Sequence, residues 1–159
     1  MKQRTISAVV WMLIGMALMG AIVWFAMPSM MLIRRPSPRG YDETIALLNQ
    51  SLASKEDWRV LAVNDYQKAT AAFGTIERTG SISVCNPRYA ARILADDADR
   101  GVTAFMPLAI GVYEDESGRV YVTRLNVGLL GMMFGGTISD VMAMAGTDLA
   151  EVVSSVAPD

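Results

Sequence analysis

An uninterrupted apolar run near the N-terminus is the feature that most constrains this chain. No charged residue lies between Arg4 and Arg34, and only one serine and two glycines interrupt the apolar residues from 6 to 27. Twenty-two helical residues rise roughly 33 Å at 1.5 Å each, which matches a hydrocarbon core of about 30 Å. The run therefore predicts a transmembrane helix over residues 6–27, in contact with the lipid bilayer.

The run favours an uncleaved anchor over a cleaved signal peptide, because it is longer than an ordinary signal-peptide core and no small-x-small pair precedes Pro28. Proline is a poor residue for continuing a helix, so the span is expected to end near Met27. This divides the chain into an anchor, residues 1–28, and a folded domain, residues 29–159.

Residues 30–35 (MMLIRR), which precede Pro36 and Pro38, are predicted to form the first strand of that domain.

Charge is distributed unevenly along the chain. Residues 1–39 hold five basic and no acidic side chains, whereas residues 40–159 hold nine basic and sixteen acidic ones, a net charge of −7. A count of basic residues alone favours a cytoplasmic domain, but a short basic head before a long apolar run is typical of a signal anchor that exports the remainder of the chain. We expect export. The acidic domain without a basic patch disfavours nucleic-acid binding.

The residue inventory excludes several kinds of chemistry. The chain has no histidine and one cysteine, which removes Ser-His-Asp triads, Cys-His dyads, His-ligated zinc, axial-His haem and an intrachain disulfide. We therefore expect no catalytic residues, and the sequence specifies no cofactor.

Periodicity and turn signals place the elements of the domain. Helices are expected after Gly40, over residues 66–73, from Pro87 with Asn86 as N-cap, and over residues 129–156 with breaks at Gly135-Gly136 and Gly146; strands are expected over residues 58–64, 80–85, 106–114 and 119–126. In the tail, Thr137 with Asp140 and then Thr147 are expected to start helices. This order predicts an α+β two-layer sandwich with a mixed or antiparallel sheet.

The motifs also resemble a known family. The run SVCNPRYA at residues 83–90, the pair Met106-Pro107, and VYE at 112–114 with GRV at 118–120 resemble domain-of-unknown-function family 302. The stretches 27–31 and 124–136 are similar to its membrane-anchored branch in bacteria and archaea. The resemblance implies a TATA-binding-protein-like α+β fold that is often dimeric, and no assigned reaction. Together with the expected export, we predict a bacterial inner membrane location for the anchor, with the domain in the periplasm.

The sequence departs from the family's pattern at one position. Many members carry a cysteine directly after the proline of the second motif, where this chain has Leu108. Any activity that needs a cysteine pair in those relatives is therefore in doubt here.

Cys85 is the first candidate site residue, because it directly precedes a helix N-terminus where unpaired N–H groups stabilise a thiolate. Arg88, one turn into that helix, adds positive charge, and Asn86 lies between them. These three residues are candidates for ligand binding. The alternative is that Cys85 is a small packed residue, and we favour this protected thiol because no base or second thiol accompanies it.

The methionines raise a soft-metal hypothesis, since thioethers and a thiolate suit Cu(I). Cys85 and Met106 are the candidate ligands, and further methionines cluster at positions 27, 30, 31, 132, 133, 142 and 144. However, seven of the twelve methionines lie in residues 1–31, where methionine is an apolar filler. Packing is the favoured explanation.

Arg124 and Asn126 are the last candidates, on one face of a predicted strand. Together they can bind a carboxylate or phosphate; the plainer alternative, which we favour, is a solvated strand end where Arg124 pairs with Glu114 across the hairpin. Ala109 and Gly111 leave one sheet face shallow, and the apolar stretch GLLGMMFGG at 128–136 suggests a surface that packs on a membrane or partner, or core.

These observations support two functional hypotheses. The first is a non-enzymatic, single-pass membrane-anchored accessory or ligand-binding subunit of a bacterial membrane complex. The alternative is a thiol-dependent redox or soft-metal protein, handling copper or a haem-related group through Cys85.

Overall fold

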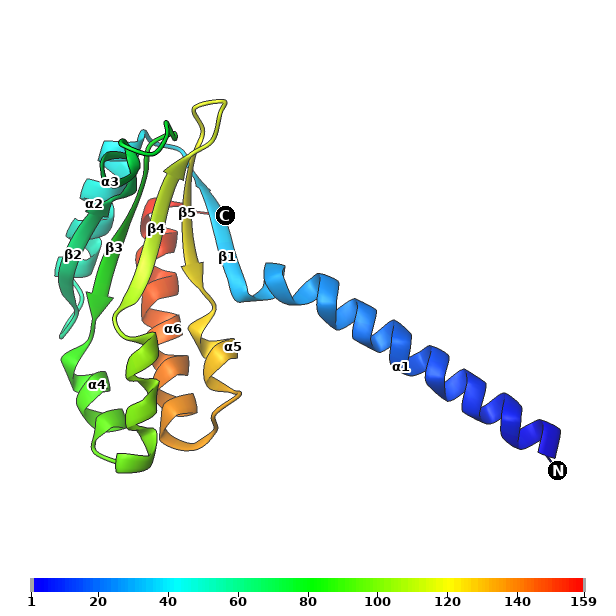
Figure 1. Ribbon diagram of the computed structural model, residues 1–159. Coiled ribbons are helices and arrows are strands. Elements are labelled where there is room, and N and C mark those ends of the chain that lie inside the picture. The colour runs from blue at the N-terminus through cyan, green and yellow to red at the C-terminus, as the bar shows by residue number, and fades with distance from the viewer. Residues whose placement is uncertain (1, 159) are drawn as a thin grey trace.

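The computed structural model describes the backbone of residues 2–158 and the side chains of residues 11–158. A long helix, α1 (Lys2–Met31), extends away from a domain in which helices lie against a sheet (Figure 1). The other helices are α2 (Tyr41–Ala53), α3 (Tyr66–Thr70), α4 (Pro87–Leu94), the 3₁₀ helix η1 (Asp97–Phe105), α5 (Val127–Gly131) and α6 (Gly136–Val156). The strands are β1 (Leu32–Ser37), β2 (Arg59–Asp65), β3 (Thr79–Cys85), β4 (Leu108–Glu114) and β5 (Val120–Leu125).

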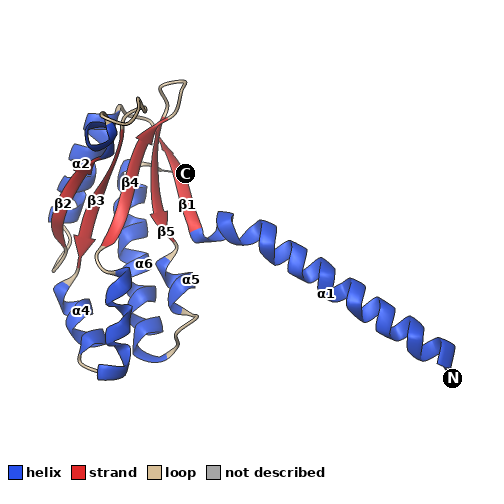
Figure 2. Ribbon diagram, viewed as in Figure 1, coloured by secondary structure: helices blue, strands red, loops and turns tan. Residues whose placement is uncertain are grey.

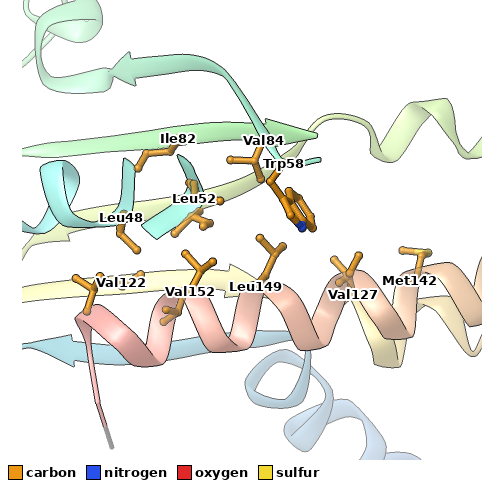
Figure 3. Packing of buried hydrophobic residues seen from close by; sticks show 14 of the residues in the cluster. Leu48, Leu52, Trp58, Ile82, Val84, Val122, Val127, Met142, Leu149 and Val152 are labelled. Atoms are coloured by element: carbon orange, nitrogen blue, oxygen red, sulfur yellow. The ribbon is translucent and has the colours of Figure 1, made fainter. Parts of the chain in front are cut away.

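The sheet confirms the predicted α+β class. Its strand order is β1-β5-β4-β3-β2, and each neighbouring pair is antiparallel. Helices α2 and α6 cover one face (Figure 2). The other face is open except beside α3, where the Tyr66 hydroxyl lies 2.9 Å from the hydroxyl of the buried Ser81. Strand residues alternate between the faces, so those such as Ile82 and Val122 meet α2 and α6 in the core (Figure 3).

The apolar run forms an exposed helix. Residues Trp11–Met31 have a mean hydropathy of 1.8 and are long and apolar enough to cross a membrane. The first part of the expected span, residues 6–10, lies outside the residues whose side chains are described.

The end of this helix differs from the sequence prediction. The helix continues through Pro28 to Met31, and β1 begins at Leu32 rather than Met30. Pro28 has no N–H to donate to the Trp24 carbonyl, so the last turn of α1 continues with the loss of one backbone hydrogen bond. Strand β1 also runs through Pro36, because it is an edge strand, where a missing N–H is tolerated.

Asn126 joins α1 to the domain. Its backbone N–H donates to the Met31 carbonyl at 2.8 Å and its side-chain amide donates to the Met30 carbonyl at 3.2 Å. Its side-chain oxygen accepts from the N–H of Leu129 at 3.3 Å and so caps α5. One residue therefore serves the last carbonyls of α1 and the first turn of α5.

The tail is more continuous than predicted. Helix α6 runs unbroken through Gly146, and Thr147 lies inside it, with its hydroxyl donating to the Ala143 carbonyl at 3.1 Å. A Cβ on Gly146 would lie 3.2 Å from the Gly128 nitrogen, so this glycine allows α5 to pack closely on α6. The predicted helix start at Thr147 is therefore wrong, because α6 is continuous from Gly136 to Val156. The predicted capping box is also wrong, since α6 starts after Gly135 without a side-chain cap.

Removal of β1 should disrupt the sheet, because β1 pairs with β5 over six residues and its loss exposes a strand edge and apolar surface. We expect a chain of residues 40–159 to aggregate or unfold at a lower temperature than a chain of residues 29–159. Circular dichroism melting and size-exclusion chromatography measure this. Equal melting temperatures would show that residues 29–39 are only a linker.

Candidate functional site

An apolar pocket of ≈ 50 Å³ lies between α4, η1, α6 and the adjoining ends of β3 and β4. Cys85, Tyr89, Leu108 and Met142 are among the side chains that line it. For comparison, an apolar cavity of about 150 Å³ holds benzene. This pocket therefore suits a group of only a few heavy atoms.

Cys85 is the last residue of β3 and lines this pocket, half-buried. Burial raises the pKa of its thiol, opposite to the lowered pKa expected from the helix N-terminus. The Asn86 side chain already accepts from the N–H groups of Arg88 (3.1 Å) and Tyr89 (3.2 Å). This confirms Asn86 as the N-cap, and it leaves these two donors unavailable to a thiolate.

Arg88 does not pair with the Cys85 thiol either, because it is engaged by acidic residues. Its guanidinium binds Asp57 at 2.8 Å and lies 3.6 Å from Glu56. Asp57 has a φ of 60°, the left-handed region that a non-glycine residue seldom occupies.

Arg88 and Asp57 belong to a second, polar pocket of ≈ 230 Å³. Its lining residues are Lys55, Glu56, Asp57, Asn86, Arg88, Tyr89 and Asp148. Asn86 and Tyr89 line both pockets, so an apolar and a charged compartment adjoin across α4. Arg88 and Asn86, two of the predicted site residues, therefore come together here, with Cys85 on the apolar side.

Asp148 connects the two compartments, and sequence reasoning missed it. One of its carboxylate oxygens accepts from the Trp58 indole N–H and from the Tyr89 hydroxyl, each at 3.0 Å. The Trp58 and Tyr89 rings meet edge to face, with centroids 6.2 Å apart. The available signal was an acidic residue in a largely apolar helical tail.

Arg124 lies apart from both pockets. It is only 8% exposed and stands opposite Ile110, whereas Glu114 stands opposite Val120. The favoured pairing of Arg124 with Glu114 is therefore wrong. The register places Arg124 on the helix-covered face with Val120 and Val122, a consequence of the two-residue alternation of a strand.

The buried guanidinium is poorly satisfied. Its Nη1 donates to the Leu125 carbonyl at 3.4 Å, and its Nε has no hydrogen-bond partner. Burial first, and the nearby charge of Arg35 second, lower the pKa of Arg124. Asn126, predicted to bind ligand beside it, is instead engaged at the junction of α1 and α5.

Cys85, Met106 and Met142 all line the apolar pocket, so the structure brings two predicted soft-metal candidates and a third sulfur-bearing residue together. Met132 and Met133 are exposed elsewhere. Within residues 11–158, no group of three or more Cys, Asp or Glu side chains is arranged to hold a metal ion. Ala109 and Gly111 lie on the open face of the sheet, while both pockets lie on the helix-covered side.

Comparisons with known proteins show which family and which solved structure this chain resembles. The family model for the domain of unknown function DUF302 matches residues 33–156. The chain is similar to the crystal structure of an uncharacterized conserved DUF302 protein from Bacillus stearothermophilus, with a TM-score of 0.70 and 25% identity, covering 80% of this chain and 99% of that chain. No curated protein matches the chain.

The Cys85 thiol should react slowly with iodoacetamide in the native protein, with a rate midpoint above the ordinary thiol pKa of about 8.5, because burial raises its pKa. Arg88→Ala should leave the midpoint unchanged, since Arg88 binds Asp57. Unfolding in urea should restore ordinary reactivity. Fast native alkylation at neutral pH would contradict this.

Asp148→Ala should lower the free energy of unfolding by about 2 kcal/mol, because the buried Trp58 indole N–H loses its acceptor. Tyr89→Phe removes one hydrogen bond and should cost about 1 kcal/mol. Urea unfolding monitored by Trp fluorescence measures both. Asp140→Ala, an exposed site on the same helix, is the control and should change stability by less than about 0.5 kcal/mol.

Proposed function

This chain belongs to the family of the domain of unknown function DUF302, and we propose from its own residues that it is a single-pass membrane-anchored subunit that binds a small ligand without transforming it. The pair of adjoining pockets carries the proposal. One compartment is apolar and small, and the other presents charges of both signs.

The two compartments define a class of ligand. The apolar pocket takes a short alkyl or thioether group, and the polar pocket takes a charged head beside Arg88, Asp57 and Asp148. Pockets that combine apolar walls with a few convergent polar groups are the usual form of small-molecule sites. The ligand is therefore a small amphipathic molecule, bound with Asn86 and Tyr89 at the boundary between its two parts.

Membrane anchoring is supported by α1, whose described side chains are exposed except for Ala26 and Met31, which are partly buried. The proposed location is a bacterial inner membrane, with the domain exported and serving a larger membrane complex. The basic residues at the start of the chain, before the long apolar run, support this orientation.

Ligand binding is testable with the full chain in phospholipid nanodiscs. Leucine, butyrate and n-butylamine share a short alkyl chain but differ in the charge of the head. We expect saturation transfer from the protein to the alkyl protons of at least one of these probes. Ala90→Leu, which fills the apolar pocket, should abolish this transfer.

Ala91→Leu is the matched control, because it adds the same side chain on the exposed side of α4. Saturation transfer from this variant should equal that of the unchanged protein. No transfer to any of the three probes, or equal transfer in both variants, would contradict the proposal.

A second candidate function rests on Cys85, Met106 and Met142, three sulfur-bearing residues that line one pocket. Three soft donors suit Cu(I), so this arrangement favours soft-metal handling over two-thiol redox chemistry, which a single cysteine does not support. Native alkylation of Cys85 that is fast, and that Cu(I) blocks, would favour this second function.

A further inference from the structure

An exposed apolar cluster occupies the connection between α5 and α6. Met132 and Met133 are 72% and 71% exposed, and Phe134 beside them is also exposed. The Phe134 ring meets Phe105, from the end of η1, edge to face with centroids 5.8 Å apart. We call Phe105 and residues 132–134 the apolar loop cluster.

The sequence around this cluster is unusual for a connection at a water-exposed surface. No charged residue occurs from Leu125 to Ser139. Contiguous exposed apolar groups of this kind mark sites of contact with protein, membrane or ligand. Flexible methionines and a phenylalanine also suit the irregular boundary between headgroups and acyl chains.

The position of the cluster selects the partner. Helix α5 contacts α1, and Asn126 fixes the start of α5 to the Met30 and Met31 carbonyls at the end of α1. Figure 1 shows α5 and its connection to α6 on the side of the domain from which α1 leaves. A bilayer that contains α1 is therefore adjacent to the cluster.

We propose that the apolar loop cluster inserts into the same lipid bilayer as α1 and forms a second membrane contact. The inference rests on the proposed anchoring of α1. With two contacts, the domain lies at a fixed tilt against the membrane, and the mouths of the two pockets keep a constant direction relative to the bilayer surface.

Spin labelling of the full chain in phosphatidylcholine–phosphatidylglycerol liposomes tests this inference. Labels are placed by Met133→Cys and, as a matched control, by Phe73→Cys, both in a Cys85→Ala background. Phe73 is 92% exposed and lies just after α3, which is on the side of the domain away from α1 in Figure 1. Collision rates with oxygen, which partitions into lipid, and with nickel–EDDA, which stays in water, are then compared.

We expect the ratio of oxygen to nickel–EDDA collisions to be at least fivefold higher at position 133 than at position 73. Met132→Cys should behave like Met133→Cys, which guards against a local effect of one label. Equal ratios at positions 133 and 73 would overturn the inference. Low collision rates with both reagents at position 133 would also overturn it, because that result is expected if a second copy or another protein covers the cluster.

Alkaline carbonate washing separates failure of this inference from failure of the anchoring. A chain that stays with the liposomes while its position-133 label remains in water overturns only the second contact. A chain that carbonate releases overturns the anchoring and the second contact together.

Discussion

The burial of a single face of the sheet is the constraint on which the rest of the domain depends. Alternate residues of β3, β4 and β5 turn toward α2 and α6, and their apolar surface is removed from water only while those helices stay in place. The helices cover the middle of this face. Near the adjoining ends of β3 and β4, helices α4 and η1 cover the core together with α6. The apolar pocket lies between these elements.

Asn86 lies beside this pocket, at the junction between β3 and α4. By accepting hydrogen bonds from two N–H groups of α4, its side chain sets the point at which the strand ends and the helix begins. Cys85, just before this cap, lines the apolar pocket, and Arg88, just after it, lines the charged one. The same capping that makes the CNP motif recognisable also removes the free N–H groups that would have activated the thiol.

Features decided by local chemistry could be predicted from the sequence, and those decided by tertiary contact could not. The cap at Asn86, the alternation of Ile82 and Val84, and the hairpin between β4 and β5 depend on near neighbours. Arg124 was misjudged because its face depends on the alternation along β5 relative to the helices. The candidate site was predicted in part: Cys85, Asn86 and Arg88 adjoin, whereas Asp148 enters from a helix that lies far along the chain, 59 positions beyond its partner Tyr89.

The junction at Asn126 has a mechanical consequence. Because one residue holds the end of α1 and the start of α5, the two helices cannot rotate independently without breaking its hydrogen bonds. Helix α5 in turn packs closely on α6, since a side chain at Gly131 or Gly146 would collide with the facing helix. Helix α6 supplies Val141, Met142 and Ala145 to the wall of the apolar pocket. A torque on the N-terminal helix would therefore reach the wall of the pocket through this chain of contacts.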